Sequence, residues 1–215
     1  MLKIWGRASA VNVQKAMWAV GETGAPFERI DLGGKFGGLD DPGYVAKNPN
    51  RRVPTLEDDG LVLYESGAIV RYLAAKYSPE NLWSQNEAER ALIDQWMEWT
   101  VSTLYPDFIT LFWLVFRTPI ADRNLPRIAS INEAVNKSYA ILEEHLEGRD
   151  YLVGNRFTAA DIPAGMTLYR YFEMKEIEIP SLPNVRNWYQ RLCERPAYQA
   201  HVMLDFEELR GRLDF

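Results

Sequence analysis

Glu65 and Ser66 lie where the residue pattern changes from that of a strand to that of a helix. Residues 61–64 are apolar, and Ile69 and Leu73 fall on one helical face. The hydroxyl of Ser66 and the free N–H groups of a helix start suit an anion, aided by the helix dipole. Ser66 is equally consistent with a simple helix cap. The acidic neighbour Glu65 favours a ligand that also carries an ammonium group.

A second chemical feature is the pair Val53-Pro54, at the start of the short run of residues 53–56, which has β-branched residues and apolar residues at alternate positions. Proline cannot donate to a sheet ladder, so it belongs at a strand start, an edge or a bend. A cis bond here would leave the N–H and C=O of Val53 free to pair with an extended peptide as an added strand. An ordinary trans bond at a strand start is the alternative.

The glycine-rich segment 33–38, GGKFGG, is the third feature. It is not a phosphate-binding loop, because Lys35 is followed by Phe36 rather than Ser or Thr, and no helical pattern follows. The segment is either a flexible connection or a loop that brings Lys35 to the carboxylate of a ligand.

Composition limits the classes of partner. The chain has 215 residues and a net charge of −6, and its acidity lies in the second part: 10 basic and 9 acidic residues precede position 79, and 14 and 21 follow. An acidic balance argues against nucleic acid. The single cysteine, Cys193, excludes a disulfide framework, and His145 and His201 stand apart, so we expect no metal. Without a signal sequence or an uninterrupted membrane-length apolar run, we expect a cytoplasmic protein that does not enter membranes.

The elements that position these features form two groups. A strand–helix–strand unit is predicted from residues 2–5, a helix face that ends near residue 22, and residues 27–32. Two hairpin strands and a further helix are predicted in residues 53–77. These units predict an α+β domain over residues 1–78 with a four-stranded mixed sheet. Residues 79–86 read as a linker, and residues 87–215 as an all-helical domain.

Within the helical part, the segment Phe157-Thr158-Ala-Ala-Asp161-Ile162 is a capping box with an apolar staple. Thr158 can cap the helix, and Asp161 can reach back toward it. We therefore expect a structural rather than a catalytic role for Asp161.

Another feature, Tyr105-Pro106, predicts an interruption in the preceding helical pattern, because proline opens or kinks a helix.

Three segments together resemble the glutathione S-transferase family, in particular its bacterial theta-, beta- and nu-like members. They are GRASAVNVQKAMW near the start, NPNRRVPTLED with LVLYESGAIVRYLA, and GNRFTAADI, in family order across about 160 residues. The resemblance implies a thioredoxin-like version of the predicted sheet domain, a helical bundle behind it, and a homodimer.

The resemblance also implies a ligand, glutathione, which is a tripeptide with a thiol, two carboxylates and an ammonium group. Ser66 and the helix start would hold the γ-glutamyl carboxylate, and Glu65 the ammonium group. The Val53 backbone beside Pro54 would pair with the cysteinyl residue. Lys35 or Arg52 would meet the glycyl carboxylate.

The reaction implied by the resemblance needs the thiolate of glutathione, and a hydroxyl or amide donor lowers the thiol pKa. Family members carry that donor in the turn after the first strand. Similar bacterial members have serine where this chain has Ala10. Ser9, one place earlier, either takes the role or is a turn serine; otherwise Asn12 and backbone N–H groups hold the sulfur.

The second substrate implied by the resemblance is an apolar electrophile. Aromatic residues on the first helices of the helical part would face the thiol, or else pack in the core: Tyr105, Phe108, Phe112 and Trp113. A glutathione transferase is the leading hypothesis. A glutathione-dependent disulfide reductase or peroxidase, and a non-catalytic interaction protein of the same fold, are the alternatives.

Overall fold

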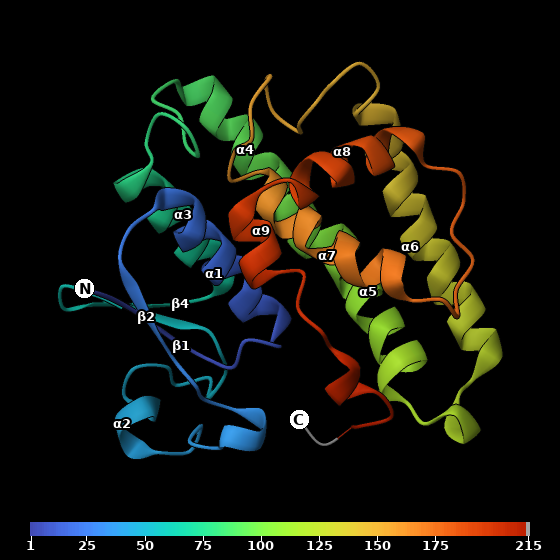
Figure 1. Cartoon of the computed structure of the whole chain (residues 1–215), viewed down its shortest axis with the longest axis horizontal. Coiled ribbons are helices and arrows are strands. Elements are labelled where there is room, and N and C mark those ends of the chain that lie inside the picture. Colours follow the sequence, from blue (N-terminus) through green and yellow to red (C-terminus); the bar gives the residue numbers. More distant parts are fainter. Residues whose placement is uncertain (214–215) are drawn as a thin grey trace.

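A four-stranded mixed sheet forms the N-terminal part of the chain in the computed structural model, which describes residues 1–213 (Figure 1). Its strands are β1 (Leu2–Trp5), β2 (Phe27–Ile30), β3 (Thr55–Asp58) and β4 (Leu61–Tyr64), in the order β2-β1-β3-β4. Strand β1 is parallel to β2 and antiparallel to β3, and β3 is antiparallel to β4. The predicted α+β sheet is confirmed.

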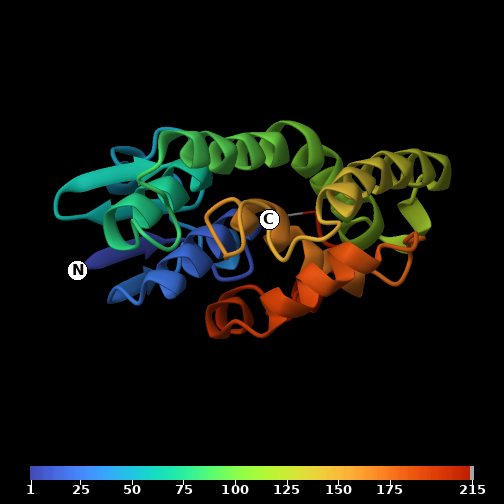
Figure 2. The same cartoon turned by 90° about the horizontal axis from the view of Figure 1, so that it is seen from above.

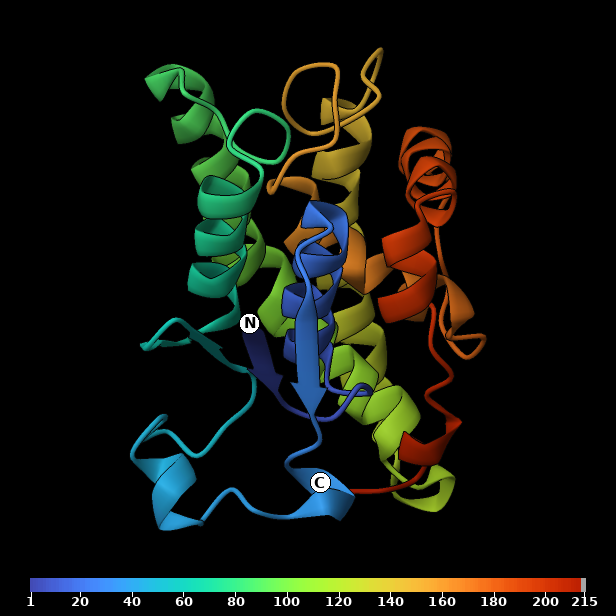
Figure 3. The same cartoon turned by 60° about the vertical axis from the view of Figure 1, so that its left-hand side comes forward.

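Two helices cover the sheet and connect it to the rest of the molecule. Helices α1 (Val11–Thr23) and α3 (Ser66–Tyr77) pack on each other, and α1 also contacts α7 and α9 of the helical part (Figure 3). A short helix that the sequence did not reveal, α2 (Pro42–Val45), precedes β3 and is capped by the Asp41 carboxylate, which accepts from the Gly43 N–H.

The C-terminal part is helical, as predicted. Figure 2 shows α6 on the side away from the sheet. Its helices are α4 (Glu87–Trp99), α5 (Tyr105–Phe112), α6 (Leu125–His145), α7 (Asp161–Glu173), α8 (Pro183–Cys193) and α9 (Pro196–His201). Residues 79–86 contain no helix or strand, and their assignment as a linker between two domains stays a prediction.

The interruption predicted at Tyr105-Pro106 takes the form of a widened turn rather than a break. Helical structure runs without a gap through Glu87–Arg117, with π-helical segments at Thr100–Leu104 and Trp113–Arg117. A π-segment inserts a residue into the hydrogen-bond ladder, which lets the helix pass a proline that has no N–H to donate. This run is the one helix among residues 1–213 long and apolar enough to cross a membrane, and its residues Phe108 and Leu111 are buried in the helical core.

Asp161 reaches back to the Thr158 N–H as predicted, whereas α7 begins at Asp161 with Ala160 as its N-cap residue and without a side-chain cap. Asp161 is fully buried and accepts from the backbone N–H groups of Thr158 (2.9 Å) and Leu152 (3.0 Å). It also accepts from Nε1 of Trp188 on α8, at 3.1 Å. The Thr158 hydroxyl in turn accepts from the Ala160 N–H at 3.3 Å. Asp161 therefore ties the start of α7 to the preceding loop and to α8.

The segment after α9 returns along the boundary between the sheet and the helices (Figure 1). Up to residue 213, it contains one 3₁₀ turn, at Glu207–Leu209. The Gly211 N–H donates to the carbonyl oxygen of Phe116 at 3.0 Å, and Nε of Arg117 donates to the carbonyl oxygen of Arg212 at 2.8 Å. These contacts fasten the tail to the end of the long helical run, a placement for which the sequence offered no pattern.

Candidate functional site

A small cavity of about 80 Å³ lies at the start of α3, beside the bend at Pro54. The Val53–Pro54 peptide bond is cis, one of the two alternatives left open by the sequence. The structure brings together here all the residues predicted to bind glutathione, except Lys35. The cavity is lined by Asn12, Asn48, Asn50, Arg52, Val53, Pro54, Glu65 and Ser66.

Glu65 and Ser66 adopt an arrangement that simple capping does not explain. Ser66 is the first residue of α3, and its hydroxyl is within 3.4 Å of Oδ1 of Asn12, to which it donates, instead of accepting from its own helix. Glu65 has a positive φ of 70°. A non-glycine residue in this region costs about 1–3 kcal/mol, and such strain concentrates at functional sites. The helix start, with its free N–H groups, therefore faces the cavity as an anion-binding end.

The loop before Pro54 is held by buried side chains. The carbonyl oxygen of Arg52 accepts from the Tyr44 hydroxyl (2.6 Å) and from Nδ2 of Asn48 (2.8 Å). The Tyr44 hydroxyl also lies 2.8 Å from the hydroxyl of Thr55. This network fixes the backbone of Arg52 and Val53, which line the cavity.

A second cavity, of about 380 Å³, adjoins the first between the sheet and the helical part. The two share Asn12, Arg52 and Val53. Its other lining residues come from the turn before α1 and the first residue of α1, from the segment between β2 and β3, from α5 and the π-turn after it, from α7 and from the tail: Arg7, Ser9, Ala10, Val11, Gly34, Leu39, Arg51, Tyr105, Ile109, Phe112, Trp113, Arg117, Arg170 and Leu209. A ligand in the small cavity can therefore extend one end into a larger chamber.

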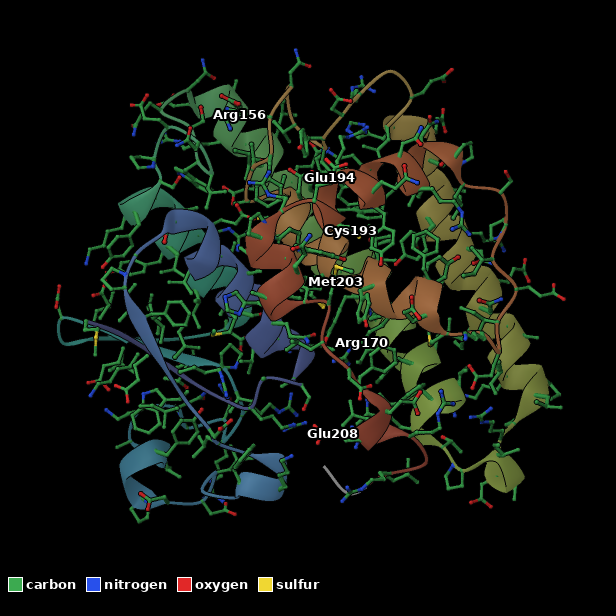
Figure 4. The ribbon with its side chains drawn as sticks, viewed as in Figure 1. Arg156, Arg170, Cys193, Glu194, Met203 and Glu208 are labelled. Carbon is green, nitrogen blue, oxygen red and sulfur yellow. The ribbon has the colours of Figure 1, made fainter. Side chains whose placement is uncertain are left out.

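Ser9 lies in the larger cavity and is held from two sides. Its carbonyl oxygen accepts from Nη2 of Arg170 on α7 at 2.7 Å. Nζ of Lys35 lies 3.1 Å from the carboxylate of Glu208 in the tail, which the Ser9 hydroxyl also faces. The Ser9 hydroxyl and the Lys35 ammonium group hold the pKa of Glu208 below its usual range. Figure 4 shows Arg170 and Glu208 on the side of the helical part that faces the sheet.

Asn12 occupies the junction of the two cavities. Besides its contact with Ser66, Asn12 lines the larger cavity together with Tyr105 of α5, and its side chain acts to lower the pKa of the Tyr105 hydroxyl. Burial raises the pKa of Tyr105 to about 12, so its hydroxyl keeps its proton at neutral pH. Asn12 and Tyr105 together thus place polar groups where the anion-binding end meets the larger chamber.

Comparison with known proteins decides the family. Residues 1–75 match the model of the glutathione S-transferase N-terminal domain, and residues 92–196 match that of the glutathione S-transferase C-terminal domain. Glutathione S-transferase GstB of Escherichia coli K12 is 36% identical over 206 residues, which are 95% of this chain and 99% of GstB. The chain belongs to the glutathione S-transferase family.

Solved glutathione S-transferase structures agree with this assignment. A theta-class enzyme from the citrus canker pathogen Xanthomonas axonopodis pv. citri, solved with glutathione bound, is 50% identical and superposes with a TM-score of 0.90. The match covers 95% of this chain and 98% of that one. Glutathione S-transferase 4 of Zea mays is 30% identical over 200 residues, or 91% of this chain and 89% of the maize protein. The predicted family and its thioredoxin-like fold are confirmed.

The structure separates the predicted glutathione S-transferase site residues into two groups. Most of them line one of the two cavities. Phe108 does not: it is fully buried and packs near Tyr105, with ring centroids 6.4 Å apart. Lys35 also lines neither cavity, because its ammonium group is paired with Glu208. No three His, Cys, Asp or Glu residues among residues 1–213 are placed to hold a metal ion.

Sequence reasoning missed several residues that line the larger cavity of this glutathione S-transferase. Ile109 follows Tyr105 by four residues, and Arg117 follows Trp113 by four, so the helical period was a signal for both. Arg170 and Glu208 carried no such signal. They reach Ser9 from 161 and 199 positions further along the chain, and only the packing of α7 and the tail brings them there.

Lys15, on α1 beneath the site, is a further cation that the sequence did not single out. It is only 2% exposed, and its Nζ lies 4.0 Å from the centre of the Tyr105 ring. Burial lowers the pKa of Lys15 to about 7, although the Glu65 carboxylate acts in the opposite direction. The folded protein therefore binds this proton less tightly than the unfolded chain, whose lysine titrates near 10.5.

Replacing Lys15 with methionine is therefore expected to raise the free energy of unfolding at pH 7. The gain should be constant below about pH 7, where the side chain is charged in both states. It should fade as the pH rises toward 10, because the folded protein has then lost this proton while the unfolded chain still holds it, so unfolding of the wild type takes up a proton and becomes less favourable. Urea unfolding from pH 6 to pH 10 measures this difference. A gain that stays the same across this range would contradict the assignment of the effect to the buried charge.

Proposed function

We propose that this transferase conjugates the thiol of glutathione to an electrophile at the two adjoining cavities. One observation carries the proposal: the small anion-binding cavity and the larger chamber share Asn12, Arg52 and Val53. A tripeptide anchored in the first therefore presents its thiol at the entrance of the second. The structure of the Xanthomonas relative with bound glutathione supports this choice of ligand.

Each end of glutathione has a matching group in this site. The α3 start and Ser66 suit the γ-glutamyl carboxylate, and Glu65 suits its ammonium group. The backbone of Val53 suits the cysteinyl residue as an added strand. Arg52 is placed for the glycyl carboxylate, whereas Lys35 can reach it only after releasing Glu208.

Replacing Ser66 with alanine is expected to weaken glutathione binding by about 1–3 kcal/mol, or about 5- to 150-fold in Kd, because a charge-assisted hydrogen bond is lost. Isothermal titration calorimetry measures this change. Ser102→Ala, at an exposed serine that bonds only its own helix, is the matched control and should bind as the wild type does. Equal affinity of the Ser66 variant and the wild type would remove Ser66 from the site.

A panel of halo-aromatic, disulfide and peroxide substrates separates conjugation from the reductase or peroxidase alternative. Retention on immobilised glutathione tests the non-catalytic alternative.

The homodimer and the cytoplasmic location stay predictions. Size-exclusion chromatography with light scattering tests whether the protein is a homodimer.

A further inference from the structure

A buried lysine lies within one helical turn of the junction between the two cavities. Lys15 is on α1, three residues after Asn12, which lines both cavities. Side chains three residues apart lie on one face of a helix, with about 5–6 Å between their Cβ atoms. Lys15 lines neither cavity and is only 2% exposed, so its charge is held in the protein interior beside Asn12.

The ammonium group of Lys15 has an aromatic ring, rather than an acid, as its contact. Nζ lies 4.0 Å from the centre of the Tyr105 ring of α5, and Tyr105 lines the larger cavity. Within residues 1–213, this ammonium group makes no hydrogen bond and no ion pair. A cation–π contact offsets only part of the cost of burying an ammonium group. The protein therefore holds a positive charge here without a directly bonded counter-charge.

The groups that act on Lys15 come from the elements around α1. Burial lowers the pKa of Lys15 to about 7, and the Glu65 carboxylate, between β4 and α3, acts in the opposite direction. Tyr105 faces Lys15 from α5 and keeps its proton at neutral pH. From α7, Arg170 reaches the neighbouring Gln14 at 3.3 Å. Because the pKa of Lys15 is close to neutral pH, a further negative charge nearby increases its protonated fraction.

We infer that Lys15 is a positioning residue for the sulfur of glutathione: acting through Tyr105 and Asn12, its ammonium group favours the ionised sulfur at the junction of the two cavities. The inference rests on the proposed function and adds a residue to it. Lys15 contacts Tyr105, not the sulfur, and its charge acts across an interior where water screens little. The stability expected to be gained by removing this charge is then the cost of keeping it for the reaction.

The protons balance without a further reactant. When glutathione binds and its thiol ionises, the S–H proton passes to water. The negative sulfur raises the pKa of Lys15, which takes up a proton from water. At pH 8, we therefore expect the wild type to release fewer protons per bound glutathione than Lys15→Met does. Calorimetry in buffers of different ionisation enthalpy measures this number.

The pH dependence of thiolate formation tests the inference. The ultraviolet absorbance of the thiolate in the glutathione complex gives the apparent pKa of the bound thiol. We expect Lys15→Met to raise this pKa by about one unit and to reduce kcat/KM with a halo-aromatic substrate by up to about tenfold at pH 7, with recovery at alkaline pH. Lys15→Arg keeps the charge and should stay closer to the wild type. Lys137→Met, which removes an exposed lysine of α6, is the control and should leave this pKa unchanged.

S-Methylglutathione, whose sulfur cannot ionise, separates an effect on the sulfur from an effect on the carboxylates or on packing. At pH 8, Lys15→Met should weaken glutathione binding by up to about tenfold and should change S-methylglutathione binding by less than about twofold. If the two ligands lose affinity in equal proportion, or if the bound thiol keeps its wild-type pKa in Lys15→Met, the inference is overturned.

These measurements distinguish the inference from the proposed function. A raised thiol pKa in Lys15→Met, with no turnover of any electrophile by the wild type, would refute conjugation but support the role of Lys15. Turnover by the wild type, with the same thiol pKa in both proteins, would support conjugation and refute the role of Lys15. Loss of the fold does not account for either result, because Lys15→Met is expected to be the more stable protein at pH 7.

Discussion

Replacing Asp161 with alanine is expected to lower the free energy of unfolding by about 3–5 kcal/mol, among the largest effects of a single substitution. The carboxylate is fully buried and accepts from the N–H groups of Thr158 and Leu152 and from the indole of Trp188. Removing it leaves three buried donors without this acceptor, and each costs about 1–3 kcal/mol. Urea unfolding at pH 7 measures the loss.

Asp161→Asn is the matched control, because asparagine keeps the size of the side chain and one of its two acceptor oxygens. We expect it to lie between the wild type and the alanine variant in stability. Glutathione affinity, measured at a temperature where each variant is folded, should change little, because Asp161 lines neither cavity. An alanine variant with wild-type stability but lost turnover would show that the role of Asp161 is catalytic instead.

The architecture could be predicted from the sequence where a pattern repeats locally. Alternation and helical spacing located all four strands and the long helices, and the Thr158–Asp161 spacing located the capping box. The same local signals brought together Glu65, Ser66 and the Pro54 bend, since they are neighbours along the chain. The sequence did not predict the short helix α2 or the π-turns, because few residues define them and their hydrogen bonds depend on the surrounding packing.

The larger cavity could be predicted only in part. The aromatic residues of α5 share a helical face, so their grouping was visible in the sequence. The sequence did not show which of these aromatic residues line the cavity and which pack in the core. Phe108 lies in the core. The arginines that line the cavity come from four separate regions of the chain, and the tail that carries Glu208 has no periodic pattern, so their convergence is a property of the tertiary fold alone.

Replacing Asn12 with alanine is expected to reduce kcat/KM by about 100-fold, because a donor that favours the thiolate is lost. Asn12 stands between Ser66, at the anion-binding end, and Tyr105, at the entrance of the larger chamber. The sulfur of a tripeptide anchored at Ser66 must pass this point. Ala10 has no side-chain donor, and the hydroxyl of Ser9 faces the Glu208 carboxylate, whose pKa it lowers. We therefore expect a smaller loss, about tenfold, for Ser9→Ala.

The pH dependence of kcat/KM distinguishes loss of the thiolate donor from a general loss of fit. A variant without the donor should raise the apparent pKa of bound glutathione by about 1–2 units, so that its activity recovers partly at alkaline pH. Glu208→Ala supplies the counter-test, because it frees the Ser9 hydroxyl. If Ser9 is the donor instead, Glu208→Ala should lower the apparent pKa, and Ser9→Ala, rather than Asn12→Ala, should raise it. If Asn12→Ala leaves both kcat/KM and the apparent pKa of bound glutathione unchanged, the N–H groups at the start of α1 hold the thiolate instead. These groups have no side-chain cap, because Ala10 precedes the helix.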